Sequence, residues 1–271
     1  DKNYEKNLAL YKDFDNCIRS FVVANATVRA SSTSPQNSVD TINIVTSTIN
    51  INTNNNNVLF GNKNIILYGN GYIEDRIGDI KYHISPESFY QVNSMMTKTL
   101  YDKILEFAYF DNDENVLDLY CGIGTISLYI AKYVKKVTGI EIVPKAIENA
   151  KENAKINNIT NTDFICADIS ASDTVVANYY DTIIVDPPRK GLDKNTINLI
   201  KSFAPKKLIY VSCDPATLAR DLNILCHNNN DNELTKVSET QSDVRYQLKK
   251  FATVDMFPHT LHVETVVLMS R

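Results

Sequence analysis

Two hydrophobic patterns divide the chain near residue 90. Before that point, apolar and polar residues alternate with a period of two in Phe21–Ala30 and Thr41–Asn52, which is typical of half-buried strands. Two shorter apolar runs follow at Asn64–Tyr68 and Ile80–Ile84. We therefore predict a small β-rich domain over residues 1–90.

After residue 90, helical and strand-like segments alternate. Apolar residues recur every three to four positions from Met96 to Phe107, which predicts a helix whose cap is Asn93 or Ser94. Further strand-like runs are Asn115–Leu119, Lys136–Glu141, Thr162–Ala167, Asp181–Val185 and Lys207–Val211, and helix-like runs are Thr125–Tyr133, Pro144–Asn157, Lys194–Phe203 and Pro215–Cys226. This alternation predicts an α/β domain with a doubly wound parallel sheet over residues 91–271. Two consecutive strands, Tyr246–Met256 and Val263–Ser270, would end it as an antiparallel hairpin.

Length and composition exclude several classes of protein. The chain has 271 residues, 44% of them hydrophobic and 22% charged, which excludes a wholly disordered or coiled-coil chain. Its apolar runs are too short for a bilayer span and it opens without a signal peptide, so we expect a soluble, cytoplasmic protein with no membrane partner. Asp1 stands where Met would begin a native chain, which is typical of a processed or truncated piece.

Charge and cysteine usage point to no partner by themselves. The formal net charge is −4, whereas a dedicated nucleic-acid binder usually carries a basic excess. The five cysteines are odd in number and form no Cys-x-x-Cys pair, which argues against a disulfide framework and a cysteine-based zinc site. We expect reduced thiols and no metal centre.

The segment Asp118-Leu-Tyr-Cys-Gly-Ile-Gly-Thr follows a predicted strand and opens a predicted helix. Gly122 and Gly124 would let the backbone approach a ligand closely, and Glu141, at the end of the next strand, could hold ribose hydroxyls. Ser127 stands where the dinucleotide fingerprint has its third glycine, so a nucleoside cofactor fits better than a dinucleotide. A tight turn without a ligand is the alternative.

Two further motifs follow later strands. Asp186-Pro-Pro-Arg-Lys-Gly comes after the run that ends at Val185, and strand ends of this kind bind ligands in open α/β sheets. Arg189 and Lys190 could contact a substrate there, although a rigid turn with two solvated cations is the alternative. Cys213 lies just before a predicted helix, whose N-terminus would lower the pKa of the thiol and favour a nucleophilic thiolate. An inert core cysteine and a capping role for Asp214 stay open.

The last motif, Asp255-Met-Phe-Pro-His-Thr-Leu-His-Val-Glu, begins the final strand. His259 and His262 are three residues apart, but Pro258 precedes them and a metal site is not expected. Glu264 stands in an otherwise apolar strand, so its carboxylate must be paired, exposed or functional. Partial burial would raise its pKa and suit it to proton abstraction.

Taken together, these motifs resemble those of the RNA uracil-C5 methyltransferases that use S-adenosyl-L-methionine. The matching segments run in family order over residues 64–271, and their wording is closest to the bacterial 23S ribosomal RNA branch. They are SFYQVN (88–93), DLYCGIGT (118–125), GIEIVPKAIENAKENAKIN (139–157), VDPPRKGLD (185–193), VSCDPATLARDL (211–222) and DMFPHTLHVE (255–264).

The resemblance implies a Rossmann-like class I methyltransferase sheet and a defined set of site residues. It implies that Cys213 is the nucleophile and that Glu264 is the general base. It also implies RNA as the partner, ribosomal RNA ahead of tRNA, and not DNA. The cofactor residues it implies are Gln91, Tyr120, Glu141, Asp168 and Asp186, with Gly122 and Gly124 shaping the turn.

This chain departs from the family pattern in its N-terminal part. Family members usually carry an N-terminal oligonucleotide-binding TRAM domain, which this sequence lacks, and some carry a four-cysteine iron–sulfur cluster, whereas Cys17 is the sole cysteine before residue 120. Residues before 60 match poorly, and Asp214 stands where Asn is common. We therefore expect residues 1–90 to be an incomplete RNA-facing domain.

Other classes fit the motifs less well. Amino-group methyltransferases carry an aromatic residue after Asp/Asn-Pro-Pro, where this chain has Arg189, and cytosine-C5 enzymes place a cysteine in that loop. An NAD-dependent oxidoreductase gives Cys213 and Glu264 no joint role. An inactive RNA-binding module on the same scaffold stays as an alternative, which cofactor binding would distinguish.

Overall fold

The computed structural model divides into two compact units. One comprises residues 1–73 with 85–87, and the other residues 74–84 with 88–271. The residues that the structure describes are 12, 44–51, 61, 63–169, 179–227, 244–260 and 263–271. The predicted strand Phe21–Ala30 lies outside them.

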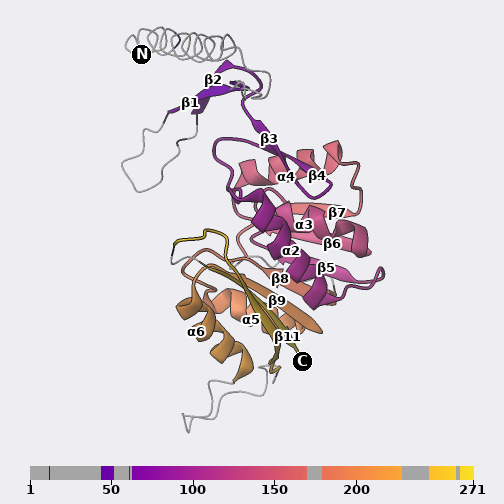
Figure 1. Ribbon diagram of the computed structural model, residues 1–271. Coiled ribbons are helices and arrows are strands. Elements are labelled where there is room, and N and C mark those ends of the chain that lie inside the picture. The colour runs from indigo at the N-terminus through magenta and orange to yellow at the C-terminus, as the bar shows by residue number, and fades with distance from the viewer. Residues whose placement is uncertain are drawn as a thin grey trace, which may run out of the picture. The chain divides into compact units, whose positions relative to one another are not determined.

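Seven described strands of the larger unit form one sheet in the order β10-β11-β9-β8-β5-β6-β7 (Figure 1). Strand β11 runs antiparallel to both of its neighbours, whereas β9, β8, β5, β6 and β7 are mutually parallel. The predicted parallel sheet with a terminal antiparallel hairpin is therefore confirmed. The strands are β5 (Asn115–Leu119), β6 (Lys136–Glu141), β7 (Thr162–Cys166), β8 (Thr182–Val185), β9 (Lys207–Ser212), β10 (Gln247–Val254) and β11 (Glu264–Ser270).

Helices cover both faces of this sheet, which is why its central strands are continuously apolar. Along β8, Ile183 packs into one buried cluster and Ile184 into the other, and Leu208 and Ile209 of β9 divide in the same way. Helices α2 (Ser94–Ala108), α3 (Thr125–Ile130) and α4 (Pro144–Ile156) belong to one cluster, and α5 (Lys194–Phe203) and α6 (Pro215–Cys226) to the other. The predicted helix Thr125–Tyr133 divides into α3 and a 3₁₀ turn, η1 (Ala131–Tyr133). Within the described residues, no helix has the length and apolar character that crossing a bilayer requires.

Side-chain caps set the start of three helices. Asn93, not Ser94, caps α2 by accepting a hydrogen bond from the Met96 N–H. Asp193 caps α5, and Asp214 caps α6 by accepting from the N–H groups of Ala216 and Thr217. Each cap satisfies backbone donors that the helix leaves unpaired, so these residues determine where the loops end.

A hairpin that the sequence pattern did not resolve belongs to the larger unit. It consists of β3 (Ile73–Ile77) and β4 (Ile80–Ile84), joined through Gly78 at a φ of +59°. Two asparagines of α4 hold β4: Asn157 accepts from the Lys81 N–H (2.9 Å) and Asn153 from the His83 N–H (2.8 Å). Their amide groups also donate to the carbonyls of the same two residues. These bonds are the reason that residues 74–84 group with the larger unit rather than with the rest of the first 90 residues.

The described part of the smaller unit is an antiparallel hairpin of β1 (Ser47–Ile51) and β2 (Lys63–Tyr68). The Asn50 side chain stabilises it by accepting from the Gly61 N–H (2.7 Å) and donating to the Gly61 carbonyl (2.9 Å). This hairpin matches two of the strand-like runs in the N-terminal pattern.

We predict that Asn157→Ala lowers the free energy of unfolding by about 1–3 kcal/mol, because it leaves the N–H and C=O of Lys81 without partners. Lys151→Ala, an exposed change on the same helix, serves as the control. Urea unfolding of both variants measures the difference, and an equal effect of the two substitutions would contradict the role of Asn157.

Candidate active site

The loops that carry the sequence motifs meet at one edge of the sheet. Parallel pairing aligns Leu119 with Ile140 and Val185, and Val185 with Tyr210, so β5, β6, β8 and β9 end at the same edge. Parallel strands place their carboxyl ends together, and this edge is where open α/β sheets bind ligands. The candidate residues that end or directly follow these strands are Tyr120, Glu141, Asp186 and Cys213.

Strand β11 brings Glu264 to the same edge from the opposite direction. Its antiparallel register pairs Thr265 with Ser212. Cys213 and Glu264 are the adjoining residues of the two segments, and the negative charge of Glu264 acts on the Cys213 thiol. The two residues proposed as base and nucleophile are therefore neighbours, although 51 positions separate them in the sequence.

The glycine-containing turn after β5 has two differently constrained glycines. Gly124 has a φ of +81°, and a Cβ there would lie 2.9 Å from the ring of Phe164 on β7. Gly122 also has a positive φ, +54°, but a Cβ there would meet no atom within 4 Å. Gly124 is thus required for packing, whereas Gly122 faces open space that a ligand can approach.

Glu141 is held by the backbone at the end of β6. Its carboxylate accepts from the Gly122 N–H (3.3 Å) and from the Val143 N–H (2.9 Å). These bonds orient the carboxylate beside the glycine-containing turn. Ile142, the next residue, exposes its side chain and adds apolar surface there.

The other candidate cofactor residues reach this edge from separate segments. The Tyr120 hydroxyl lies 3.2 Å from Thr196 Oγ1 of α5. Burial raises the pKa of Tyr120, with the negative charge of Asp168 among the lesser causes, so Asp168 lies near this ring. Gln91 is half-buried in the segment before α2. Its neighbour Asn93 donates to the Met256 carbonyl (3.0 Å) and so ties that segment to the loop that precedes β11.

Two carboxyl groups at this edge have strongly raised pKa values. Burial raises the pKa of Asp118 to about 7, against a hydrogen bond from Ser127 (2.5 Å), and Asp118 Oδ1 has no partner among the described residues. Burial, reinforced by the charges of Glu264 and Asp118, raises the pKa of Asp186 to about 8. Burial also raises the pKa of Glu264. A cationic ligand would neutralise the charge of these carboxyl groups, so the site suits a ligand that carries a positive charge.

The expected low pKa of the Cys213 thiol is wrong for this structure. Burial raises it, and the negative charges of Glu264 and Asp186 raise it further. The start of α6 does not offset this, because Asp214 already accepts from the first free N–H groups of the helix. Arg189 is the positive group that lowers the pKa of Cys213 and of Glu264.

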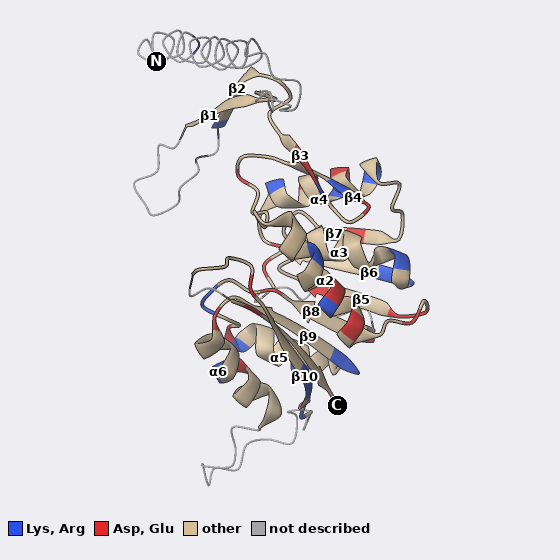
Figure 2. Ribbon diagram, in the orientation of Figure 1, with Lys and Arg blue, Asp and Glu red and all other residues tan. Residues whose placement is uncertain are grey.

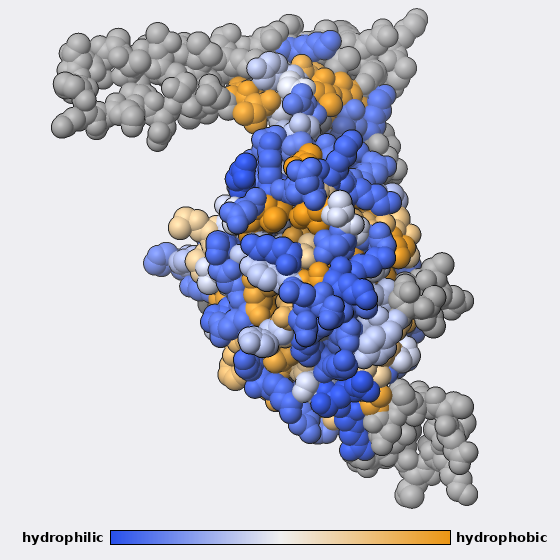
Figure 3. All heavy atoms as spheres, turned by 90° about the vertical axis from the view of Figure 1, so that its right-hand side faces the viewer, coloured by the Kyte–Doolittle hydropathy of each residue, from blue (hydrophilic) through white to orange (hydrophobic). Residues whose placement is uncertain are grey.

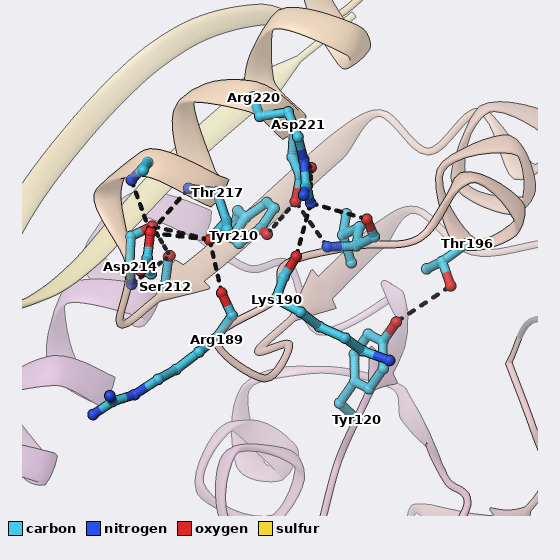
Figure 4. A network of polar contacts seen from close by, with 12 residues as sticks. Tyr120, Arg189, Lys190, Thr196, Tyr210, Ser212, Asp214, Thr217, Arg220 and Asp221 are labelled. Atoms are coloured by element: carbon cyan, nitrogen blue, oxygen red, sulfur yellow. Dashed lines mark hydrogen bonds and ion pairs between the residues drawn. The ribbon is translucent and has the colours of Figure 1, made fainter.

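Arg189 and Lys190 leave their loop in different directions. In Figure 4, Lys190 extends toward the side where Tyr120 lies, and Arg189 extends to the opposite side. The charge of Arg189 reaches Cys213, Glu264 and Asp214. The structure thus separates the two cations that the sequence motif presents as a pair.

Several residues of this site were not predicted. Asp118 is the strand residue before the recognised turn, and its place in an apolar run was the signal that could have identified it. Nothing in the sequence marked Asn93 or Asp221 as part of the site. Asn93 was predicted only as a helix cap, and acidic residues such as Asp221 are common in helices. Asp221 is fully buried and bonds to the loop that follows Asp186.

Charge on the larger unit is mixed rather than segregated. Figure 2 shows Lys and Arg spread among Asp and Glu over this unit. Polar residues cover most of the face seen in Figure 3, with apolar atoms visible between them. Apolar side chains exposed beside Gln91 include Phe89 and Val92.

The sheet order, the glycine-containing turn and the acidic residue that ends β6 define a class I methyltransferase fold. A solved structure of a tRNA m1G37 methyltransferase from M. jannaschii shares this fold at a TM-score of 0.52 and 14% identity, covering 77% of this chain and 60% of that one. More specifically, the chain belongs to the tRNA (uracil-5-)-methyltransferase family, whose model matches residues 52–271.

Individual relatives agree with this membership. An uncharacterized RNA methyltransferase of Bacillus cereus is 50% identical over 218 residues, which cover 78% of this chain and 43% of the relative. A solved structure of the tRNA (uracil-54, C5)-methyltransferase of Pyrococcus abyssi, in complex with S-adenosyl-L-homocysteine, is similar at a TM-score of 0.66 and 29% identity. That match covers 88% of this chain and 54% of the other. The chain therefore spans less than half the length of the curated relatives it matches.

We predict that Asp118→Asn weakens the dependence of stability on pH. The pKa of Asp118 is about 7 in the folded chain and about 4 in the unfolded chain, so the folded state binds this proton more tightly. Its stabilising contribution is complete below about pH 4 and is lost as the pH rises through about 7.

The measurement is urea unfolding at about pH 5 and about pH 8. The free energy of unfolding should fall less in Asp118→Asn than in the unsubstituted chain, whereas Asp113→Asn, on an exposed turn, should leave the difference unchanged. The same fall in all three chains would show that Asp118 does not carry a raised pKa.

Proposed function

We propose that this chain transfers a methyl group from S-adenosyl-L-methionine to C5 of a uridine in RNA. The observation that carries the proposal is the register of β9 and β11, whose last pair, Ser212 with Thr265, adjoins Cys213 and Glu264 at the ligand-binding edge of a uracil-5-methyltransferase family member. A thiol and a carboxyl group at neighbouring positions are what C5 methylation of uracil needs.

The residues present fit S-adenosyl-L-methionine as the cofactor. Glu141 would bind the ribose hydroxyls, and the open space at Gly122 would admit the backbone approach. Tyr120, Asp168, Asp186 and Gln91 would complete the binding set. Buried Asp118 and half-buried Asp186 favour a cationic group, and Asp118 Oδ1 has no hydrogen-bond partner within the described part of the chain. When bound, the cofactor supplies an electrophilic methyl group on a sulfonium.

Cys213 would make C5 of uracil nucleophilic. Its thiolate adds to C6, and the electrons of the C5=C6 bond move toward the C4 carbonyl as an enolate, which activates C5. Arg189 is the cation whose charge reaches the thiol and would favour both the thiolate and the enolate. The raised pKa of Cys213 in the free chain means that substrate binding must favour the thiolate further.

Glu264 would complete the reaction by removing the C5 proton. Loss of that proton re-forms the C5=C6 bond and expels the Cys213 thiolate, so the enzyme returns to its starting state. Burial raises the pKa of Glu264, which makes its carboxylate a stronger proton acceptor than an exposed one.

The proposed substrate is 23S ribosomal RNA, supported by the wording of the motifs. The Pyrococcus abyssi neighbour acts on uracil-54 of tRNA by its name, which favours tRNA as the second candidate. In either RNA the base must be unstacked, and the exposed ring of Phe89 beside Gln91 offers a stacking surface. We propose that residues 1–90 face the RNA and that residues 91–271 form the methyltransferase domain.

The test is intact-protein mass spectrometry of the chain mixed with S-adenosyl-L-methionine and RNA that contains 5-fluorouridine. Fluorine cannot leave C5 as a cation, so a methylated RNA adduct on Cys213 should accumulate. Peptide mapping locates it, and 23S ribosomal RNA fragments and tRNA are compared as substrates. Cys213→Ala should form no adduct while binding the cofactor as tightly as the unsubstituted chain.

The outcomes separate the alternatives. An adduct on another cysteine would overturn the nucleophile assignment. Cofactor binding, followed by calorimetry, without an adduct on either RNA would contradict methylation of uridine by this chain. Absence of cofactor binding would favour an inactive RNA-binding module.

We predict a different defect for Glu264→Gln. This variant should form the adduct with unmodified RNA and release it at least about 100-fold more slowly, because no base removes the C5 proton. Rapid-quench kinetics with gel separation of the adduct measures both steps. Normal turnover, or loss of adduct formation, would contradict the assignment of Glu264.

A further inference from the structure

Side chains of α6 hold the backbone of the loop that follows β8. Arg220 Nη2 donates to the carbonyls of Lys190 (2.9 Å) and Leu192 (3.2 Å). Asp221 Oδ2 accepts from the Leu192 N–H (2.8 Å), and the Thr217 hydroxyl lies 3.1 Å from the Arg189 carbonyl oxygen (Figure 4). Loop residues 189–192 are thus fastened along the first turns of the helix that begins just after Cys213.

The two fastening residues are themselves tightly fixed. Arg220 Nε donates to Asp221 Oδ1 (2.8 Å), and Arg220 Nη2 lies 2.7 Å from the same oxygen. The Tyr210 hydroxyl of β9 donates to Asp221 Oδ2 (2.7 Å), and Asp221 is fully buried. The pair therefore links β9, α6 and the loop in one network of charge-assisted bonds.

Gly191 shows how closely the loop lies on this pair. Its φ is +72°, and a Cβ there would lie 2.5 Å from Asp221 Oδ2 and 2.6 Å from Arg220 Nη2. Only glycine allows the loop backbone to approach the pair at this distance. The motif glycine is explained by this contact rather than by a ligand.

We propose that Arg220 and Asp221 are positioning residues, which hold loop 189–192 so that Arg189 faces Cys213 and Glu264 while Lys190 faces the Tyr120 side. The network grips backbone atoms on both sides of Gly191 and leaves both cationic side chains free to extend. Arg189 is the first residue of the held segment, and its positive charge lowers the pKa of the Cys213 thiol. This inference rests on the proposed function in one respect, which is that Cys213 is the nucleophile.

The test titrates the Cys213 thiol in the full chain without RNA or cofactor. The rate of alkylation by iodoacetamide is followed against pH, with peptide-level mass spectrometry to separate Cys213 from the other cysteines. The acidic groups whose charges act on this thiol are Glu264 and Asp186, and Arg189 is the opposing cation. Arg189→Gln should raise the midpoint by about 0.4 pH unit, the effect of one partly solvated charge several ångströms away.

The decisive variant is Arg220→Lys, which keeps the charge but loses the planar fork that reaches two carbonyls. It should raise the midpoint by at least half of the Arg189→Gln shift. The double variant should shift no further than Arg189→Gln alone, because both changes act through the same guanidinium. Lys206→Gln, which removes a surface cation paired with Asp181 at the opposite edge of the sheet, should leave the midpoint unchanged.

Three results would overturn the proposal: an unmoved midpoint in Arg220→Lys, an additive double variant, or an unmoved midpoint in Arg189→Gln. A merely structural role would lower the thermal midpoint of unfolding without moving the thiol titration of the folded chain. Should Arg220→Lys fail to fold, Asp221→Asn takes its place. It should raise the Cys213 midpoint by at least half of the Arg189→Gln shift, and combining it with Arg189→Gln should give no further shift. The titration needs no turnover, so its result is independent of methylation. The positioning role can therefore be wrong while the methyltransferase function holds, and the methyltransferase function can be wrong while the positioning role holds.

Discussion

The register of neighbouring strands is the constraint on which the site depends. Parallel pairing carries the ends of β5, β6, β8 and β9 to one edge, and the antiparallel pairing of β11 brings its first residue to the same edge. A slip of one residue in β11 would turn Glu264 to the other face of the sheet. Because Val266 and Val267 pack into different core clusters on the two faces, the slip would also exchange the side chains that fill each cluster.

The same burial concentrates uncompensated acidity at this edge. Asp118, Asp186 and Glu264 all have raised pKa values, and Arg189 is the cation that lowers the pKa of Glu264 and of Cys213. Holding ionisable groups in a poorly solvated place lowers stability, and proteins accept that cost where groups act on a ligand. The position of Arg189 therefore matters for the charge balance at this edge. Side chains of α6 hold the backbone of its loop, residues 189–192, by several hydrogen bonds.

The candidate site was predicted in outline from local motifs. Strand ends, turn glycines and a lone carboxylate in an apolar strand selected Glu141, Asp186, Cys213 and Glu264, whereas Gln91, Tyr120 and Asp168 came from the family resemblance. The sign of the Cys213 pKa shift was not predicted, because it depends on burial in the folded chain and on the charges of Glu264 and Asp186, which arrive from distant segments. The Arg220–Asp221 pair was missed because its partners are backbone atoms of another loop.

Hydrophobic periodicity alone determined the order of strands and helices, the doubly wound sheet and the terminal hairpin, since these follow from which positions must be buried. Periodicity did not reveal β3, whose short run is mostly polar, nor the asparagines of α4 that hold β4 by imitating a neighbouring strand. Tertiary structure also decided which charges meet, because Coulomb interactions and desolvation depend on distances in space that sequence separation does not contain.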